Sequence, residues 1–397
     1  MSTGTRRLAI VSTHPIQYLS PWFRALAQEP NIDLEVFYCH QESAQDQARA
    51  GFGVEFAWDL PLLEGYPYRF LRNVSSKPAA GSFKGMDTPE VGRILDEGRF
   101  DAVMVNGWHY KSAWQTILAC WKARRPVMAR GDSHLHTPRA GWKQAAKKVG
   151  YRPFISRLDA CLAVGKWSSE YYRAYGAKPD RIFVVPHCVD AERFTRSAAE
   201  LAPERTRLRE QWGLQPDTMV FLFAAKFIPK KRPLDFVNAV AQARAAGAAV
   251  EGLMVGDGPL RAECEARVRE TGAPVRFAGF LNQTEIVQGY VAADVFVLGS
   301  DGGETWGLVV NEAMTCGLPS LVSDQVGCGP DLVLPGKTGD IFPLGDVDAL
   351  GRLMASYAAK PAWVRDLGLA AREKIREYSL PAAVAGMQRA LDRVVRR

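Results

Sequence analysis

Apolar and polar positions follow two alternating periods along this chain. Short β-branched runs with strand character, such as RLAIVST and IDLEVFYCH, precede segments with helical periodicity, such as LSPWFRALAQ and SAWQTILACWKARR. The same alternation resumes in the second half, where MVFLFAA, VEGLMVG and DVFVLGS are separated by LDFVNAVAQARAAG and PLRAECEARVRETG. Repeated strand-helix-strand units of this kind predict a parallel sheet covered on both faces, formed twice.

The predicted fold class is therefore α/β, with two Rossmann-like domains whose parallel sheets face each other across a cleft. The join lies near the polar stretch PHCVDAERFTRSAAELAPE, so we predict domains at 1–190 and 191–379. A helix predicted at 380–397 packs back on the first domain. Ligands are expected beyond the carboxyl ends of the strands.

The composition is that of a folded chain of 397 residues, with 47% hydrophobic and 23% charged residues. No apolar run reaches the roughly 18 residues that span a bilayer, and the start of the chain does not read as a secretion signal. The seven cysteines are odd in number and form no CxxC pair, which indicates reduced thiols. We therefore expect a cytoplasmic protein.

The net charge of +7 is already present in residues 1–190, where 25 basic residues face 18 acidic ones. The first half is thus expected to meet something anionic. Nucleic acid is disfavoured, because the chain has no helix-turn-helix, zinc-finger or RNP-type motif. An NAD-dependent oxidoreductase is disfavoured too, because neither half carries GxGxxG after its first strand.

The stretch DGGETWGLVVNEAM places two acids around a predicted helix that runs from about Leu308 to about Cys316. Glu304 lies on the loop before this helix, and Glu312 lies one turn beyond Leu308. Free backbone N–H groups near Gly307, Leu308 and Val309 would suit an anion.

Two acids beside such an anion site suggest a diphosphate ligand with hydroxyl groups at both ends, as in a nucleotide sugar. The alternative is that Glu312 is a solvated helix acid and that Glu304 only interacts with the helix dipole. The spacing alone leaves both interpretations open.

The region from Val220 to about Asp346 resembles the donor-binding domain of glycosyltransferase family 4, retaining enzymes of the GT-B fold. The motifs FAAKFIPKKRP, VGDGP, FAGFL and ETWGLVVNEAM occur in the family's order, followed by CGLPSLVSD and GKTGDIF. A looser resemblance covers the first half, through the strand ending before His109 and through FVVPHCVDAERF.

The resemblance implies that Lys226 and Lys231 neutralise the donor diphosphate, although Lys230 and Arg232 compete with Lys231 for this role. It implies that Glu304 binds hydroxyls of the donor sugar and that Glu312 binds the ribose. It implies that backbone around Gly279, Phe280 and Leu281 meets the nucleobase. The remaining donor contacts that it implies are Gly256, Gly303, Trp306, Gly307, Leu308 and Val309. VGDGP can also be a simple turn.

In the first half, the resemblance implies that His109 is an active-site histidine beside the reacting sugar, although a lone histidine more often packs or caps. Candidate acceptor or donor-sugar contacts are His14, Gln17, Arg130, Asp132, His134 and His136. The HxH pair lacks acidic or cysteine partners at ligand spacing. The family reaction needs no catalytic metal, so we expect neither a metal nor a cofactor beside the sugar-nucleotide substrate.

Three positions depart from the family pattern. The first βα junction reads HPIQY in place of a glycine-rich turn, so the way in which the first domain meets the donor stays open. His187 and Cys188 stand where the family usually has Asn-Gly, and Trp306 stands where Phe or Tyr is commoner.

The sequence therefore predicts a retaining glycosyltransferase that moves a sugar from a nucleotide diphosphate sugar to a hydroxyl acceptor. The acceptor is expected to be a saccharide or a lipid-linked saccharide of bacterial glycan biosynthesis. Two alternatives remain, a nucleotide-sugar epimerase of the GT-B fold and a non-catalytic protein that binds nucleotide sugars.

The stretch 139–157, RAGWKQAAKKVGYRPFISR, has six basic residues and no acidic residue. Trp142, Tyr151, Phe154 and Ile155 are interleaved with the charges, which suggests peripheral contact with an anionic membrane. A solvated helix face is the alternative, and Pro153 is expected to interrupt any long helix.

Overall fold

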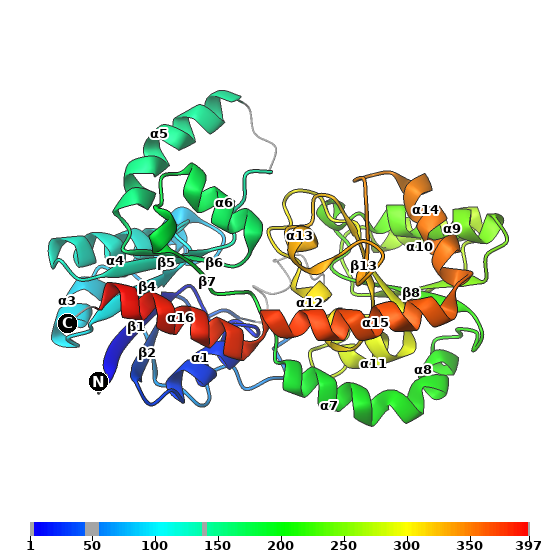
Figure 1. Ribbon diagram of the computed structural model, residues 1–397, viewed down its shortest axis with the longest axis horizontal. Coiled ribbons are helices and arrows are strands. Elements are labelled where there is room, and N and C mark those ends of the chain that lie inside the picture. Colours follow the sequence, from blue (N-terminus) through cyan, green and yellow to red (C-terminus); the bar gives the residue numbers. More distant parts are fainter. Residues whose placement is uncertain (1–3, 44–54, 137–140, 396–397) are drawn as a thin grey trace. The chain divides into compact units, whose positions relative to one another are not determined.

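The computed structural model describes residues 4–43, 55–136 and 141–395, without the side chains of 141–148. Its contacts divide the chain into two compact units (Figure 1). The first unit comprises residues 1–42, 61–188 and 379–397. The second comprises 43–60 and 189–378. The division at 188/189 lies close to the predicted join, but the described residues 55–60 belong to the second unit and not to the first.

The first unit contains a seven-stranded parallel sheet in the order β3-β2-β1-β4-β5-β6-β7. The strands are β1 (Arg6–Ser12), β2 (Ile32–Tyr38), β3 (Tyr68–Phe70), β4 (Ala102–Asn106), β5 (Val127–Gly131), β6 (Ala160–Ala163) and β7 (Ile182–Val184). All but β3 coincide with apolar runs that predict strands, although β7 is half-buried at two residues and exposed at Val184.

Two apolar cores cover the faces of this sheet. On one face, Ile10 of β1 packs with Trp22 and Phe23 of α1 and with Met387 of α16. On the other, α4 and α6 supply Ile117 and Tyr171. The helices of this unit are α1 (Ser20–Ala27), η2 (Phe83–Gly85), α3 (Val91–Glu97), α4 (Lys111–Lys122), α5 (Gly141–Arg157), α6 (Lys166–Ala174), η3 (Pro179–Arg181) and α16 (Leu380–Val394).

Helix α16, the last of the chain, runs beside α1 in the first unit, as predicted (Figure 1). A proline lies in its first turn, where the missing N–H costs no helical hydrogen bond. Its buried face includes Val384, Met387 and Leu391. Burial of each such side chain stabilises the fold by roughly 1.5–3 kcal/mol, so α16 is a structural part of this unit.

The basic stretch differs from expectation in two respects. Pro153 does not interrupt the helix, because α5 continues through it to Arg157. Phe154 and Ile155 are buried in the core, 5% and 1% exposed, and Phe154 packs on Trp114 with ring centroids 4.6 Å apart. This packing holds the helical turn that Pro153 weakens, and it removes both side chains from the set predicted to face a membrane.

The second unit contains a six-stranded parallel sheet in the order β10-β9-β8-β11-β12-β13. The strands are β8 (Met219–Ala224), β9 (Val250–Val255), β10 (Val275–Gly279), β11 (Val295–Leu298), β12 (Ser320–Ser323) and β13 (Gly339–Phe342). The central strands β8, β9 and β11 are buried along their whole length, which is typical of a parallel sheet covered on both faces.

Helices α9 and α14 pack side by side on this sheet. Phe236, Val240 and Met354 contribute to the core beneath them. The helices of this unit are α7 (Ala191–Leu201), η4 (Ala202–Glu204), α8 (Arg205–Gln211), η5 (Pro229–Lys231), α9 (Pro233–Ala245), α10 (Arg261–Thr271), α11 (Ile286–Ala292), α12 (Leu308–Thr315), α13 (Gly329–Leu332), α14 (Val347–Ala358), α15 (Pro361–Ile375) and η6 (Arg376–Tyr378).

Candidate functional site

The motifs of the second half all follow the carboxyl ends of neighbouring strands. Lys226 follows β8, Gly256 follows β9, Gly279 ends β10, and Glu304 lies between β11 and α12. Because β10, β9, β8 and β11 are adjacent and parallel, these loops meet at one edge of the sheet. The fold therefore brings the predicted donor residues together, as expected of a ligand site in this class of sheet.

At this edge, Lys231 forms an ion pair with Glu304. The two side chains are 14% and 12% exposed, so the pair is largely shielded from water. Lys230 approaches the same carboxylate at 3.8 Å, from a more exposed position. Arg232 turns away and binds Asp235 at 2.5 Å. Lys231 is thus the basic residue of this loop in closest contact with Glu304.

The ion pair fixes the charge of Glu304. Burial alone would raise the pKa of this carboxyl, but the charges of Lys231 and Lys230 outweigh it and lower the pKa below the ordinary value. An ionised carboxylate accepts hydrogen bonds and donates none. Glu304 is therefore suited to hold the hydroxyl groups of a ligand.

Helix α12 begins at Leu308, as predicted, and ends one residue earlier than expected, at Thr315. Its N-cap, Gly307, has a φ of +105°, a left-handed conformation that favours glycine. The first turn has neither a side-chain cap nor an acidic residue. The helix thus presents backbone N–H groups whose partial positive charge favours an anion.

Glu312 is not a solvated helix acid, because its residue is only 8% exposed. The Tyr290 hydroxyl of α11 donates a hydrogen bond to its carboxylate at 2.7 Å. Burial raises the pKa of Glu312, while the Tyr290 hydrogen bond and the charge of Arg193 act against that rise. The interpretation of Glu312 as a solvated helix acid is therefore wrong. Because burial of a carboxylate is unfavourable, its position needs a functional or structural reason.

Two further residues beside Glu312 were not predicted. Arg193, in the first turn of α7, donates to the Gln283 backbone oxygen at 2.6 Å and to its side-chain oxygen at 3.0 Å. The Gln283 side chain also acts to lower the pKa of Glu312. Arg193 lies in the segment FVVPHCVDAERF, which had already been singled out in the sequence. The spacing of that segment, however, did not indicate a contact near Glu312.

The remaining glycines of the site differ in their surroundings. Gly256 has a φ of +125°, and a Cβ built there would lie 2.1 Å from the Ala225 oxygen. Because glycine has no side chain, the loop after β9 can pass close to the loop after β8. This is the structural role of glycine in a tight turn. Gly303 donates its backbone N–H to Asp301 at 2.8 Å. That Gly256 and Gly303 contact the donor stays a prediction.

Two family models match this chain. One, described as glycosyl transferases group 1, matches residues 204–378. The other, described as a glycosyl transferase 4-like domain, matches residues 15–188. The chain belongs to glycosyltransferase family 4. The first match contains all six strands of the second unit's sheet, and the second contains β2 to β7 of the first unit's sheet but not β1.

Curated relatives of this family 4 chain include a D-inositol 3-phosphate glycosyltransferase 2 of Catenulispora acidiphila, which is 29% identical over 296 residues. That alignment covers 70% of this chain and 66% of the relative, just under two thirds of its length. A GDP-mannose-dependent monoacylated alpha-(1-6)-phosphatidylinositol monomannoside mannosyltransferase of Corynebacterium glutamicum is 24% identical over 303 residues, covering 73% of this chain and 76% of its own.

Among solved structures, HepE of Anabaena in complex with UDP has a TM-score of 0.73 and 17% identity, covering 97% of this chain and 99% of its own. This likeness and the two parallel sheets confirm the GT-B fold with two Rossmann-like domains.

In the first unit of this family 4 chain, the predicted residues follow three adjacent strands, β1, β4 and β5. His109 is exposed beyond the end of β4, while Gln17 is half-buried in the loop after β1. His14 contacts Glu42 at 3.3 Å. Burial, aided by the nearby His40, lowers the pKa of His14 to about 4, so at pH 7 a neutral ring, and not a cation, lies beside the Glu42 carboxylate.

Arg130 lies at the end of β5 and is only 4% exposed. One of its terminal nitrogens lies 3.2 Å from His187 Nδ1 and 3.3 Å from the Pro186 oxygen. Burial, followed by the charge of Arg130, holds the pKa of His187 well below its ordinary value. His187 is therefore neutral, with Nδ1 as an acceptor, and it anchors Arg130 where other family members have asparagine.

The loop after β5 brings His134 and His136 against Trp167 of α6, with ring centroids 5.2 and 4.0 Å away. His134 is buried and His136 exposed, and Asp132 is half-buried before them. Trp167 was not predicted as part of this group. No cluster of three metal-ligating His, Cys, Asp or Glu side chains occurs within the described residues.

Trp306, predicted at the donor, is only 4% exposed, and its indole N–H donates to Asn311 at 2.9 Å. Its ring lies 5.8 Å from that of Tyr378. The side chain thus supports the loop before α12, and its contact with a donor stays a prediction.

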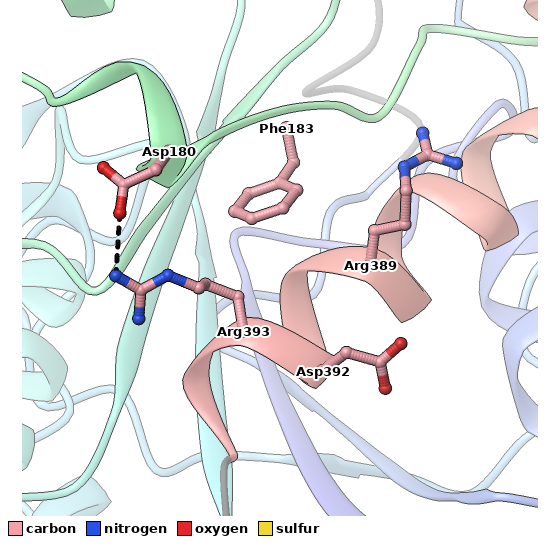
Figure 2. Close-up of a pocket in the computed structure, with 5 residues that line it drawn as sticks. All are labelled: Asp180, Phe183, Arg389, Asp392 and Arg393. Carbon is pink, nitrogen blue, oxygen red and sulfur yellow. Dashed lines mark hydrogen bonds and ion pairs between the residues drawn. The ribbon is translucent and has the colours of Figure 1, made fainter.

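A cavity of about 450 Å³ lies elsewhere in the first unit, against α16. Its lining residues are Asp180, Phe183, Arg389, Asp392 and Arg393 (Figure 2). Asp180 precedes β7, so this cavity lies at the amino end of that strand, whereas the predicted residues follow the carboxyl ends. Arg393 and Asp180 form an ion pair at 2.9 Å, and we assign the cavity no part in the site.

All seven cysteines are free, and all except the half-buried Cys316 are buried. None of the described helices is long and apolar enough to cross a membrane.

Proposed function

We propose that this protein is a retaining glycosyltransferase that moves a sugar from a nucleotide diphosphate sugar to a hydroxyl acceptor. The observation that carries the proposal is the ionised pair of Glu304 and Lys231 between the basic loop and the N-terminus of α12. Glu304 would hold the donor sugar, Lys226 and Lys231 the diphosphate, and Glu312 the ribose.

The charges suit a departing nucleoside diphosphate. Negative charge grows on the phosphate oxygens as the sugar bond breaks, so cations placed there stabilise the transition state more than the ground state. The acceptor oxygen forms its bond to the anomeric carbon from the face that the diphosphate leaves. The departing phosphate takes the hydroxyl proton, so no carboxylate nucleophile is required and the anomeric configuration is retained.

The names of similar proteins support the donor class. HepE has been solved with UDP and with UDP-glucose, and the Corynebacterium relative is named as GDP-mannose-dependent. Relatives named for inositol phosphate and phosphatidylinositol mannoside support a hydroxylated, phosphate-bearing or lipid-linked acceptor. We propose a saccharide or lipid-linked saccharide, with contacts from His109, Arg130, Asp132 and the other first-unit candidates.

The function is tested by screening UDP-, GDP- and ADP-sugars for thermal stabilisation of the protein, and by assaying the hits with candidate acceptors. Release of nucleoside diphosphate that requires acceptor, with an α-configured sugar from an α-configured donor, is the expected result. A new sugar nucleotide formed without acceptor would instead indicate an epimerase. Tight donor binding without turnover on any acceptor would favour a non-catalytic binding protein.

We further propose that the protein acts in the cytoplasm and touches an anionic membrane through the basic stretch 139–157. Residues 139 and 140, and the side chains of 141–148, lie outside the described residues. Within the rest, Val149 is 77% exposed and Arg152 is exposed. Since Phe154 and Ile155 are buried, the contact would rest mainly on charge, at about 1 kcal/mol per basic residue near the surface.

Membrane contact is tested by co-sedimentation with vesicles that contain anionic lipid. Wild type should sediment at low salt and be released by salt, because screening shortens to about 3 Å at 1 M. A variant with Lys143, Lys147 and Lys148 changed to Glu should stay in solution. A control with the same charge change at the exposed Lys84, Lys122 and Lys178 should still sediment. Equal sedimentation of all three proteins would contradict the proposal.

A further inference from the structure

Residues 55–60 lie between β2 and β3 in the sequence, yet they belong to the second unit. The Asn282 side-chain amide donates to the Ala57 oxygen at 2.8 Å. The Thr284 backbone N–H donates to a carboxylate oxygen of Asp59 at 3.0 Å, and the Thr284 hydroxyl donates to the same oxygen. The 55–60 segment is thus fastened to the loop that follows β10.

This loop is the one predicted to meet the nucleobase, and the segment brings aromatic rings to it. The Phe56 ring lies 4.5 Å from that of Phe280, tilted by 42°. Trp58 meets Phe56 edge-on, with centroids 4.9 Å apart. All three side chains are only partly buried. Phe56, Trp58 and Phe280 each keep part of their surface exposed to solvent, and Phe280 lies between Gly279 and Leu281 in the chain.

The same loop is connected to the predicted ribose site. Gln283, between Asn282 and Thr284, accepts two hydrogen bonds from Arg193, and its side chain acts to lower the pKa of Glu312. The residues that fasten the 55–60 segment thus flank a residue whose side chain acts on the predicted ribose acid. A nucleoside whose hydroxyls reached Glu312 would extend its base along this loop.

We infer that the 55–60 segment forms a wall of the nucleobase end of the donor site, with Phe56 and Trp58 offering ring surface to the base. This inference rests on the proposed function, since it presumes a nucleoside diphosphate at Glu312. Stacking on aromatic rings is tolerant of base identity, because every base has a π-face. The rings would thus add affinity, and polar groups of the loop after β10 would distinguish one base from another.

The test measures binding of UDP, GDP and ADP to the full chain by calorimetry, with inorganic pyrophosphate as a probe that has no base. Phe56→Leu keeps an apolar side chain and removes the ring. It should weaken the tightest nucleoside diphosphate about tenfold, within the range that base stacking contributes, and leave pyrophosphate binding unchanged. Phe83→Leu, at an aromatic side chain of the first unit that is 50% exposed, is the matched control and should alter neither affinity.

Asp59→Asn gives a second variant at an exposed position, where misfolding is not expected. It weakens the hydrogen bonds from Thr284 and should also lower nucleoside diphosphate affinity selectively. If both variants bind the diphosphate like wild type, or lose pyrophosphate equally, the 55–60 segment is only a structural cover and the inference fails, while the proposed function stands. If wild type binds none of the three diphosphates, the proposed function fails with it.

Discussion

The Tyr290 hydroxyl and the Glu312 carboxylate are joined by a 2.7 Å hydrogen bond, with both groups buried in the second unit. A buried carboxylate without such a donor is costly, and hydrogen bonds to charged groups contribute roughly 1.5–3 kcal/mol. Tyr290 therefore favours the ionised form of Glu312, against the effect of burial, and orients the carboxylate.

Tyr290→Phe should weaken nucleoside diphosphate binding by about tenfold or more, because the carboxylate becomes harder to ionise and less well oriented. Calorimetric titration measures the effect. Tyr357→Phe is the matched control, since the Tyr357 hydroxyl donates to Asp340 at 2.9 Å in the same unit but at another carboxylate. Equal affinity of the Tyr290 variant and wild type would contradict a role of this hydrogen bond in binding.

Glu312→Gln should stabilise the ligand-free protein more at pH 8 than at pH 5. Burial raises the pKa of Glu312 above its unfolded value, so its contribution to stability is present at low pH and is lost as the pH rises through the folded pKa. The neutral amide avoids that loss. Urea denaturation of both proteins at the two pH values measures the difference, and a larger gain at pH 5 would show that the direction is wrong.

Glu304→Gln should lower kcat strongly while nucleoside diphosphate binding changes little, because its hydroxyl contacts are expected to strengthen in the transition state. Glu312→Ala should do the reverse and mainly weaken nucleotide binding. Because Lys231 and Lys230 lower the pKa of Glu304, its loss of charge should not limit activity between pH 6 and pH 8. Equally small effects of both substitutions would overturn the two assignments.

Lys226→Ala and Lys231→Ala should each cost roughly 2–4 kcal/mol in kcat/KM, by analogy with loss of one oxyanion donor. Lys230→Ala is the control, because Lys230 is more exposed and lies 3.8 Å from Glu304, and it should change kcat/KM far less. Steady-state kinetics at saturating acceptor give the three values. A larger loss for Lys230 than for Lys231 would reassign the diphosphate contact.

Activity should survive exhaustive treatment with EDTA, because lysines and a helix N-terminus would carry the charge that a metal supplies in other transferases. The assay is repeated with Mg²⁺, Mn²⁺ or Zn²⁺ restored. A loss that one of these ions reverses would refute metal-free catalysis.

The sequence predicted most strands from their apolar runs, including β7 and β10 at sheet edges, and it missed the edge strands β3 and β13. Tyr68–Phe70 of β3 has two exposed residues and one half-buried residue, so no apolar run marks it. The basic stretch shows the opposite limit. Because they lie among lysines and arginines, Phe154 and Ile155 were predicted to be exposed. Their burial depends on which face of the helix meets the core. That face could not be assigned from the sequence, because Pro153 was expected to interrupt the helix.

The order of the motifs along the chain sufficed to predict that the loops of Lys226, Lys231 and Glu304 and the start of α12 lie at one edge of a sheet. The roles of these residues in binding stay predictions. The state of Glu312 could not be predicted, because Tyr290 lies 22 positions earlier and only packing joins them. The aromatic contacts of residues 55–60 were missed for the same reason. Their partners lie more than 200 positions away, at a separation where no local pattern indicates contact.

Because α16 belongs to the first core, that core stays incomplete until the last part of the chain has been made. A ribosome delivers residues 1–188 long before Leu380–Val394, yet Met387, Ala390 and Leu391 belong to the same apolar cluster as Ile10 and Phe23. The nascent first unit therefore exposes the α1 face of its sheet until translation is nearly complete. During that interval this face is the surface most in need of a chaperone.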